Sequence, residues 1–326
     1  MSTLKYNILR GTGLTVSQLC LGTMTFGGQT GEKDSLDIIR CAVDNGINFI
    51  DTAQMYTGGQ SEIIVGKGIK GDRERLVLAT KVSLPESEDF NSRGLNRKHI
   101  LSAIEASLKR LDTDYVDLYY MHTPDYVTPI EESLQTMDML VRSGKVRYVA
   151  ISNYASWQAC DLVWTAKTKG FAPPTVTQNV YNLLTRGIEE ELLPFALKHN
   201  MGVVVYNPIA GGLLTGKHKK DAPLAENTRF ALNSSYMDRY IHGANFDAVE
   251  KIDEIARERG MSLLEFSMKW CAARAGVDSV ITGVSKLSQL QQNIACMDGA
   301  PLDDEAFSLC DQLYRNLPSD RFKYNR

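Results

Sequence analysis

The sequence predicts an α/β protein, a (β/α)8 TIM barrel with a short N-terminal β-hairpin and an extra C-terminal helix. Short β-branched runs alternate with longer amphipathic stretches from Leu19 onward, and eight such units can be counted. This alternation is typical of a parallel sheet with crossover helices. Polar residues collect at the ends of the early strands, where the catalytic groups of such barrels lie. Single barrels commonly reach this length, so we expect residues 1–326 to form one domain.

The hairpin comes first, and its turn falls at the GTG run of residues 11–13. This run lacks the third glycine and the preceding βα unit of a dinucleotide-binding fingerprint, so it indicates a turn. The eight barrel strands are then expected at residues 19–23, 48–51, 77–81, 116–121, 148–152, 175–179, 202–206 and 279–282.

The crossover helices are predicted from apolar residues at i, i+3 and i+4 spacing. In the helix that begins at Asn96, the residues Ile100, Ile104 and Leu108 form one apolar stripe, and the charged residues between them can face water. The clearest helices of this kind span residues 34–45, 96–111, 129–143 and 188–199.

Two later segments depart from this alternation of strands and helices. Residues 211–246 follow the seventh strand, are rich in small and polar residues, and are longer than an ordinary βα connection. Loops of this length are usually functional or mobile. After the eighth unit, residues 302–317 have the pattern of an additional helix, and the tail FKYNR, residues 322–326, is expected to fold back over the mouth of the barrel.

Composition disfavours several classes of partner. The chain has 36 basic and 39 acidic residues with no long run of either sign, so we expect no nucleic-acid partner. No segment resembles a signal peptide or a membrane span, so a cytoplasmic protein without membrane association is expected. The six cysteines form no CxxC pair and the five histidines show no metal-ligand spacing. We therefore expect reduced thiols and no metal site.

Four polar residues, Asp51, Tyr56, Lys81 and His122, lie at or just after the ends of three successive predicted strands. Asp51 and Lys81 should pair, because a lone buried ammonium is costly. A lysine cation lowers the pKa of a nearby phenol, so Tyr56 is expected to donate a proton near neutral pH. His122 can hydrogen-bond a carbonyl oxygen in the same pocket. Single groups of this kind are often structural, but four at successive strand ends favour catalysis.

Amide and hydroxyl groups end the later strands. Ser152 and Asn153 follow the fifth strand, Gln178 and Asn179 lie in the sixth, and Tyr206 ends the seventh. Such groups suit a flat heteroaromatic amide, because they can hydrogen-bond its carboxamide while the tyrosine offers a face for stacking. The alternative, that they are only polar caps of barrel strands, stays open at this point.

The run GGLLTGKH, which begins at Gly211, fits the spacing of a phosphate-binding loop through Gly216 and Lys217. However, His218 stands where a magnesium-binding Ser or Thr belongs, so an NTPase is disfavoured. The glycines can still expose backbone N–H groups to a pyrophosphate, a role that needs no magnesium.

A second phosphate-binding candidate lies at the eighth strand. The run GVSKLSQLQQN places Gly283, Ser285 and Lys286 just before a helix predicted to begin near Ser288. Helix N-termini bind phosphate, and a phosphate site after strands seven and eight recurs among barrels. A simple serine N-cap explains Ser285 or Ser288 about as well on local grounds.

With these residues identified, the chain resembles the aldo-keto reductases, a family of β/α barrels that use NADPH without a Rossmann domain. The resemblance runs nearly from end to end and extends to the branch related to potassium-channel β-subunits. The motifs that carry it are LCLGTMTFGG, DNGINFIDTAQMY followed by GGQSE, VLATKV, LKRLDTDYVDLYYMHTPD, GKVRYVAISN, TQNVYNLL, VVVYNPIAGGLLTGK and GVSKLSQLQQN.

The resemblance implies a site, position by position. The catalytic tetrad of the family falls on the four strand-end residues Asp51, Tyr56, Lys81 and His122. The implied cofactor-binding set is Thr23, Met24, Asp51, Ser152, Asn153, Gln178, Tyr206, Asn207, Pro208, Ile209, Ala210, Gly212, Leu213, Lys217, Arg229, Gly283, Ser285, Lys286, Gln289, Gln292 and Asn293.

The chain departs from the family pattern at a few positions. Many relatives carry glycine where Ala150 stands, serine where Asn207 stands, and arginine near the 2′-phosphate where this chain has Lys286. Lysine keeps the positive charge but loses the bidentate fork of arginine, so NADPH is implied as the preferred cofactor over NADH less firmly than in those relatives.

The function implied is NADPH-dependent reduction of an aldehyde or ketone to an alcohol, with Tyr56 as general acid. One alternative is a nicotinamide-cofactor sensor or regulatory subunit, since potassium-channel β-subunits resemble the same family. A Schiff-base lyase with Lys81 as nucleophile is disfavoured, because the neighbouring Asp51 raises the pKa of the lysine.

The substrate is expected to be a small carbonyl compound, and sugar aldehydes, aryl aldehydes, quinones and small ketones all remain open. Four residues near the predicted mouth are candidates for lining its pocket: Phe26, Met55, Trp157 and Tyr236.

Overall fold

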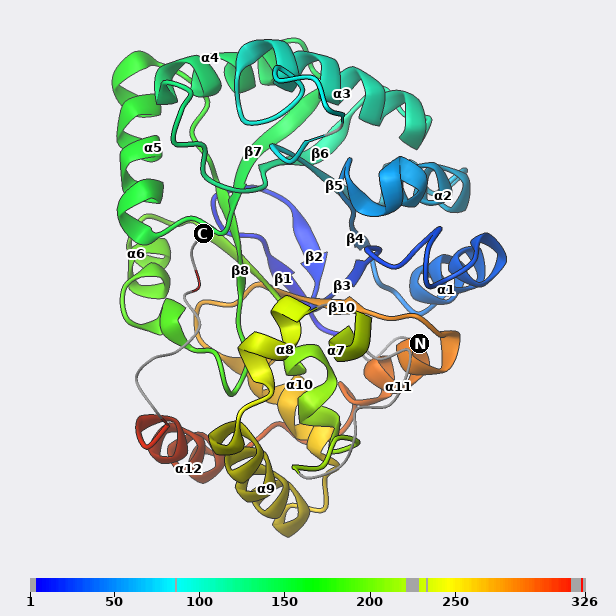
Figure 1. Ribbon diagram of the computed structural model, residues 1–326, viewed down its shortest axis with the longest axis vertical. Coiled ribbons are helices and arrows are strands. Elements are labelled where there is room, and N and C mark those ends of the chain that lie inside the picture. The colour runs from blue at the N-terminus through cyan, green and yellow to red at the C-terminus, as the bar shows by residue number, and fades with distance from the viewer. Residues whose placement is uncertain (1–3, 86, 221–228, 233, 318–323, 325–326) are drawn as a thin grey trace.

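A computed structural model describes residues 4–85, 87–220, 229–232, 234–317 and 324. Eight parallel strands close into a barrel in the order β10-β3-β4-β5-β6-β7-β8-β9, with helices around the outside (Figure 1). The predicted (β/α)8 barrel is therefore confirmed. Its strands are β3 (Leu19–Gly22), β4 (Phe49–Asp51), β5 (Val77–Val82), β6 (Val116–Met121), β7 (Val146–Ser152), β8 (Val176–Val180), β9 (Gly202–Tyr206) and β10 (Ser279–Gly283).

Both faces of the barrel strands are buried, which explains their nearly continuous apolar sequences. In β5, Val77 and Ala79 belong to the core inside the barrel, whereas Leu78 and Val82 belong to the core between the strands and the helices. Because side chains alternate along a strand, Lys81 shares the inner face with Val77 and Ala79. It is the last inward residue before the mouth.

A ring of helices covers the barrel (Figure 1). The helix predicted to begin at Asn96 is α3, and Asn96 caps it, because its side chain accepts a hydrogen bond from the backbone N–H of His99 at 2.9 Å. The helices of this ring are α1 (Glu32–Asp44), α2 (Gln60–Gly68), α3 (Arg97–Leu111), α4 (Ile130–Arg142), α5 (Ser156–Lys169), α6 (Leu192–Lys198), α10 (Leu263–Ala273) and α11 (Leu287–Ala295).

One predicted helix, residues 188–199, is wrong in its extent. The segment forms a short 3-10 helix, η3 (Gly187–Glu189), and then α6, which begins only at Leu192. Pro194 explains the late start, because proline lacks a backbone N–H and is tolerated only in the first turn of a helix. A further 3-10 helix, η2 (Arg73–Arg75), precedes β5.

The predicted break after the seventh strand is confirmed, but the segment is not a plain loop. Its described residues form η4 (Ala210–Thr215), α7 (Arg229–Leu232), α8 (Ser234–Tyr240) and the start of α9 (Gly243–Glu258). Residues 221–228 and 233 of this segment lie outside the described part of the chain. The predicted additional helix is α12 (Asp304–Arg315), which packs against α9 (Figure 1).

The N-terminal hairpin consists of β1 (Tyr6–Ile8) and β2 (Thr15–Ser17), paired antiparallel as expected. Leu9 and Val16 are fully buried in the core inside the barrel. At the turn, Gly11 has φ +74°, and a Cβ atom there would lie 2.7 Å from the carbonyl oxygen of Thr175, just before β8. The hairpin therefore closes the barrel at the end opposite the mouth.

Of the predicted tail segment, Tyr324 lies among the described residues, and residues 322, 323, 325 and 326 lie outside them. The Tyr324 hydroxyl donates to a carboxylate oxygen of Glu191 at 3.0 Å and accepts from the backbone N–H of Ser156 at 3.3 Å. Ser156 begins α5, directly after β7, so Tyr324 docks on the mouth side of the barrel.

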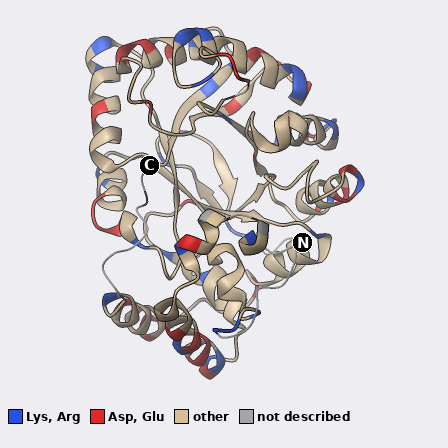
Figure 2. Cartoon of the chain, in the orientation of Figure 1, with Lys and Arg blue, Asp and Glu red and all other residues tan. Residues whose placement is uncertain are grey.

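Charged side chains of both signs lie mainly on the outer helices, and the barrel strands carry few (Figure 2). Within the described ranges, no helix is long and apolar enough to cross a membrane. The same residues contain no group of three or more His, Cys, Asp or Glu side chains arranged to hold a metal ion.

Candidate active site

A buried ion pair lies at the mouth of the barrel. Asp51 ends β4 and Lys81 lies near the end of β5, and the Lys81 ammonium contacts a carboxylate oxygen of Asp51. Lys81 is fully buried and also donates to the backbone carbonyl of Thr52 at 2.7 Å. Burial lowers the pKa of Lys81, but the Asp51 charge and the nearby Tyr56 outweigh burial, so its pKa is raised. The lysine is therefore a cation at neutral pH.

Tyr56 reaches this pair from the loop after β4. It begins a 3-10 turn, η1 (Tyr56–Gly59), and its hydroxyl lies 3.3 Å from Nζ of Lys81. The expected lowering of its pKa is wrong. Burial raises the pKa of Tyr56, and the Lys81 charge lowers it only in part, so the net shift is upward. The phenol is protonated at neutral pH and can donate.

His122 completes the predicted group of four. It directly follows β6, and its backbone is held on both sides: its N–H donates to the Val82 carbonyl at 2.8 Å, and its carbonyl accepts from the Asn153 side chain at 2.9 Å. Its ring meets the Tyr56 ring edge-on, with the centroids 6.1 Å apart. Asp51, Tyr56, Lys81 and His122 therefore meet at one place.

The polar residues of the later strands are linked to this group and to each other. Gln178 donates to Oδ2 of Asp51 at 2.8 Å, and the Ser152 hydroxyl donates to the Gln178 carbonyl at 2.9 Å. Asn153 has φ +65°, and its Oδ1 accepts from the Tyr206 hydroxyl at 2.7 Å. These bonds fix a row of amide and hydroxyl groups along one wall of the mouth. Asn179 is fully buried and does not line the cavity, because side chains alternate along β8.

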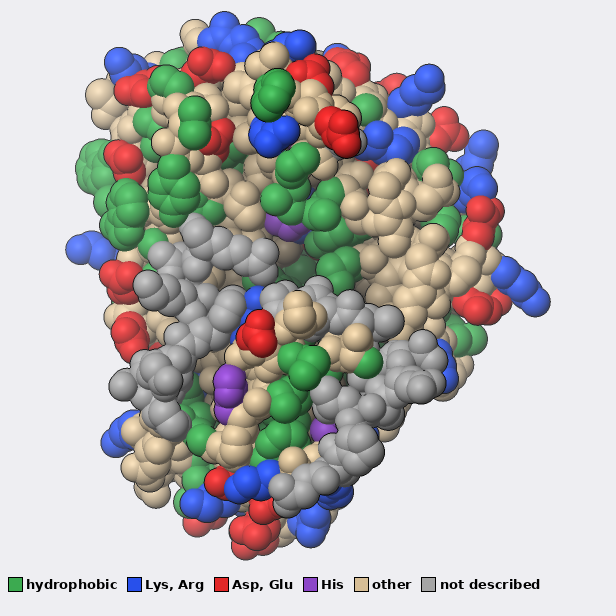
Figure 3. All heavy atoms as spheres, viewed as in Figure 1, with side chains coloured by type: hydrophobic (Ala, Val, Ile, Leu, Met, Phe, Trp, Pro, Cys, Tyr) green, Lys and Arg blue, Asp and Glu red, His purple; other side chains and the backbone are tan. Residues whose placement is uncertain are grey.

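A cavity of about 780 Å³ opens over these groups. Figure 3 shows the hollow at the centre of this face, with hydrophobic side chains along its upper rim. Of the predicted site residues, those that line the cavity are Thr23, Met24, Asp51, Tyr56, His122, Ser152, Asn153, Gln178, Tyr206, Asn207, Pro208, Ile209, Gly212, Lys217, Arg229, Gly283, Ser285, Gln289, Gln292 and Asn293.

Four predicted residues, all in the described part of the chain, are absent from the cavity wall. Lys81 lies beneath it, covered by Tyr56 and Asp51. Ala210 and Leu213 are fully buried, because they form the inner side of η4. Lys286 is solvent-exposed at the start of α11. For Ala210, Leu213 and Lys286, contact with a cofactor stays a prediction.

The candidates for lining the substrate pocket divide in the same way. Met55 and Tyr236 line the cavity. Phe26 does not, because it is fully buried in the core under α1 and α2. Trp157 is 63% exposed and borders a separate cavity of about 150 Å³ beside α5. Phe26 lies in a loop and Trp157 lies at the start of α5, and at such places the sequence does not predict the direction of a side chain.

The structure adds lining residues that sequence reasoning missed. Thr25 is held in the wall by its hydroxyl, which donates to the Val284 carbonyl at 2.8 Å. Ser262 caps α10, the signal that would have placed it at a helix N-terminus. The missed residues are Gly22, Thr25, Gln29, Leu84, Arg239, Ser262, Leu263, Leu264, Met268, Ile281, Thr282 and Val284.

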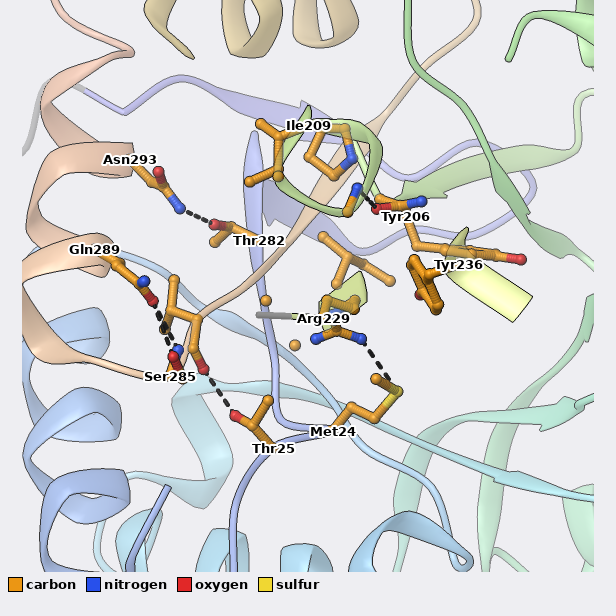
Figure 4. A pocket seen from close by; sticks show the side chains of 18 of the residues that line it. Met24, Thr25, Tyr206, Ile209, Arg229, Tyr236, Thr282, Ser285, Gln289 and Asn293 are labelled. Atoms are coloured by element: carbon orange, nitrogen blue, oxygen red, sulfur yellow. Dashed lines mark hydrogen bonds between the residues drawn. The ribbon is translucent and has the colours of Figure 1, made fainter. Parts of the chain in front are cut away.

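Three cationic residues, Lys217, Arg229 and Arg239, line the cavity from the segment after β9. Gly212 has φ +108°, and a Cβ atom there would lie 3.3 Å from Nζ of Lys217, so the glycine makes room for this ammonium. Burial lowers the pKa of Lys217, and burial together with the Lys217 charge lowers the pKa of His218. Arg229 reaches the sulfur of Met24 at 3.9 Å (Figure 4).

The start of α11 forms the far end of the cavity. Gln289 accepts from the backbone N–H of Ser285 at 2.9 Å, and Asn293 donates to the Thr282 hydroxyl at 2.6 Å. Figure 4 shows both side chains pointing from α11 toward the end of β10. This end of the cavity is therefore polar.

Comparison with known proteins agrees with this geometry. A model described as "Aldo/keto reductase family" matches residues 18–315. A "Probable voltage-gated potassium channel subunit beta" from Arabidopsis thaliana is 37% identical over 306 residues, which is 92% of this chain and 93% of that protein. "Aldo-keto reductase YhdN" from Bacillus subtilis (strain 168) is 35% identical over 97% of this chain and 96% of its own length. "Aflatoxin B1 aldehyde reductase member 2" from Rattus norvegicus is 35% identical over 88% of this chain and 83% of its own length.

Proposed function

The chain belongs to the aldo/keto reductase family, and we propose that it is an oxidoreductase that reduces an aldehyde or ketone to an alcohol with NADPH. The observation that carries the proposal is the position of Lys81. It is fully buried and lies between the carboxylate of Asp51 and the phenol of Tyr56, and the phenol faces a large cavity. The proposal also treats residues 1–326 as one domain.

The cavity fits a nicotinamide dinucleotide in size and in the chemistry of its wall. Its volume is within the range of roughly 300–1,000 Å³ that is usual for ligand sites. Ser152, Asn153 and Gln178 offer hydrogen-bonding groups to a carboxamide, and the aromatic ring of Tyr206 lies beside them. Lys217 and Arg229 offer positive charge to a pyrophosphate. The polar residues at the start of α11 suit the adenosine end and a 2′-phosphate.

A reduced nicotinamide supplies a hydride to the carbonyl carbon. The chain itself supplies the proton: Tyr56 donates it to the carbonyl oxygen as negative charge develops there. His122, beside the phenol, hydrogen-bonds the same oxygen and orients the carbonyl. Lys81 faces the phenol oxygen and stabilises the tyrosinate that the donation leaves behind, and Asp51 holds Lys81 in place.

The Schiff-base alternative is disfavoured by the same geometry. A nucleophilic lysine must be neutral, but the pKa of Lys81 is raised because Asp51 and Tyr56 outweigh its burial. Its ammonium is also engaged by Asp51, Thr52 and Tyr56.

A second candidate, a cofactor-binding regulatory subunit, rests on one observation. A relative that matches almost the whole chain is named as a probable potassium-channel subunit. In this role the cofactor would bind tightly and exchange slowly, and the protein would hold a stable partner.

The experiment that separates these functions follows the loss of reduced-nicotinamide absorbance with a panel of aldehydes and ketones, using NADPH and NADH in turn. We expect turnover by the native protein, and a loss of about 10²- to 10⁴-fold in kcat for Tyr56→Phe with nearly unchanged cofactor affinity. Tyr6→Phe, which removes a phenol bonded to the Gly46 carbonyl at the closed end, is the matched control and should keep full activity. Near-normal turnover by Tyr56→Phe would contradict the assignment of Tyr56 as the general acid. Tight cofactor binding without turnover on any carbonyl would favour the regulatory subunit.

A further inference from the structure

The turn that carries Tyr56 has an unusual backbone. The three residues that follow Tyr56 all have positive φ: Thr57 at +51°, Gly58 at +63° and Gly59 at +89°. Glycine adopts this conformation freely, but a β-branched residue such as threonine rarely does. Contacts outside the turn must therefore hold Thr57 in this conformation.

The Thr57 hydroxyl provides one such contact. Its Oγ1 lies 2.6 Å from the carbonyl oxygen of Phe26 and 2.7 Å from that of Tyr56, so its single proton is shared between these two acceptors. Phe26 is a firm anchor, because its ring is fully buried and its backbone N–H donates to the Thr23 carbonyl at 3.0 Å. The hydroxyl thus ties the tyrosine turn to the loop after β3.

Two glycines in that loop make room for the turn. A Cβ atom at Gly28 would lie 2.8 Å from Cγ2 of Thr57, and a Cβ atom at Gly27 would lie 2.6 Å from Cβ of Gln60. Both distances are too short for real side chains. The methyl and the hydroxyl of Thr57 are therefore both used in fitting the turn against residues 26–28.

We propose that Thr57 is a positioning residue, whose hydroxyl bond to the Phe26 carbonyl keeps the Tyr56 phenol within reach of Lys81 and of the reacting carbonyl. Thr57 is not part of the cavity wall, so it acts through Tyr56. The 3.3 Å between the phenol oxygen and the Lys81 ammonium leaves little room for movement. A misplacement of about 1 Å can cost about 100-fold in rate. The inference rests on the proposed role of Tyr56 as general acid.

Three substitutions separate the parts of the side chain. Thr57→Val keeps the branched shape but removes the hydroxyl, Thr57→Ser keeps the hydroxyl, and Thr57→Gly relieves the backbone but removes the hydroxyl. We expect kcat to fall at least about tenfold in Thr57→Val and Thr57→Gly, with KM and the Kd of the cofactor changed by less than about twofold. Thr57→Ser should stay within about threefold of the native kcat.

The matched control is Thr12→Val at the closed end of the barrel, where a threonine hydroxyl also donates to a backbone carbonyl, that of Leu9, at 2.7 Å. This variant should keep the native kcat. A native kcat in Thr57→Val and Thr57→Gly, or an equal loss in Thr57→Ser, would overturn the proposal. Thr57→Gly also keeps the test available where Thr57→Val does not fold.

A second measurement does not depend on turnover. Tyrosine labelled with ¹³C at Cζ gives one resonance per tyrosine, and the Tyr56 resonance is identified by its absence from Tyr56→Phe. Burial raises the pKa of Tyr56 and the Lys81 charge lowers it in part, so a phenol that moves away from Lys81 titrates at higher pH. We expect this upward shift in Thr57→Val, and an unchanged titration would contradict the positioning role. A protein that turns over no carbonyl but shows the shift would refute the reductase function and leave the positioning of Tyr56 by Thr57 supported.

Discussion

The side chain of Gln178 donates a hydrogen bond to Oδ2 of Asp51 at 2.8 Å and so joins β8 to β4 across the mouth of the barrel. The other carboxylate oxygen of Asp51 contacts Lys81. Each oxygen of this buried carboxylate therefore has a donor. The wall of amide groups and the buried ion pair form one connected network.

The first prediction concerns this bond. Gln178→Leu leaves Oδ2 of Asp51 without its donor in a buried site, so we expect a loss of about 1–3 kcal/mol in the free energy of unfolding, together with a lower kcat. Unfolding in urea and steady-state kinetics measure the two effects. Gln158→Leu, a buried glutamine that accepts from the Ala155 N–H at the start of α5, should lose stability without loss of kcat. A Gln178→Leu protein as stable and active as the native one would contradict the prediction.

The second prediction concerns the buried ion pair. Lys81→Met leaves the Asp51 carboxylate buried without its cation, and breaking a buried pair in this way costs about 3–5 kcal/mol. The double substitution Asp51→Asn with Lys81→Met removes the uncompensated charge and should recover part of that loss. Urea unfolding of Asp51→Asn, of Lys81→Met and of the double variant gives the interaction free energy between the two residues. Strictly additive losses would show that the two residues do not interact.

The third prediction concerns pH. Burial raises the pKa of Tyr56 above its usual value of 10.0 despite the opposing effect of Lys81, so the phenol stays protonated at neutral pH. With saturating cofactor and substrate, kcat for reduction should stay flat from about pH 7.5 to about pH 9.5 and fall only at higher pH. Because the folded-state pKa is raised, the stabilisation linked to this proton is present below pH 10 and is lost as pH rises through the folded-state pKa. A fall in kcat centred near pH 8, with no change in the Kd of the cofactor over the same pH range, would argue against Tyr56 as the donor.

The fourth prediction concerns cofactor choice. Lys286 is exposed at the start of α11, next to Ser285 in the cavity wall, where it can attract a 2′-phosphate without lining the cavity. Lys286→Met should weaken NADPH binding by about tenfold and leave NADH binding unchanged, with the difference shrinking at high salt. Fluorescence titration with each cofactor measures both constants. Lys98→Met on α3 is the control for a general loss of positive charge, and equal weakening of both cofactors by Lys286→Met would rule out the 2′-phosphate as its target.

The barrel could be predicted from the sequence because its strands and helices are long enough for the spacing of their apolar residues to show. The strands β6 and β9 have the bounds that their apolar runs predicted, and α3 begins directly after Asn96, where a helix was predicted to begin. The helices α7 and α8 were missed because four to seven residues are too few for a periodic stripe. Contacts distant in sequence hold them instead, such as the Phe230 ring against His218.

The meeting of Asp51, Tyr56, Lys81 and His122 could be predicted because the barrel itself orders the strand ends, so residues at the ends of neighbouring strands lie close together. The direction of the Tyr56 pKa shift was wrong because the extent of burial depends on the whole mouth, which no local pattern reveals. The direction of side chains in loops could not be predicted from the sequence either. Phe26 and Trp157 follow no strand alternation, and the structure places one in the core and the other at a separate surface cavity.

The barrel closes through the pairing of β10 with β3, in which Val280 lies opposite Leu19 and Thr282 lies opposite Leu21. During synthesis on the ribosome, one edge of β3 has no partner until nearly the whole chain has emerged. The nascent chain carries an open strand edge for most of its translation, and such edges are sites of aggregation. Gly22 and Thr282 also stand on either side of this junction in the cavity wall, so the cavity is complete only once the last strand has been made and inserted.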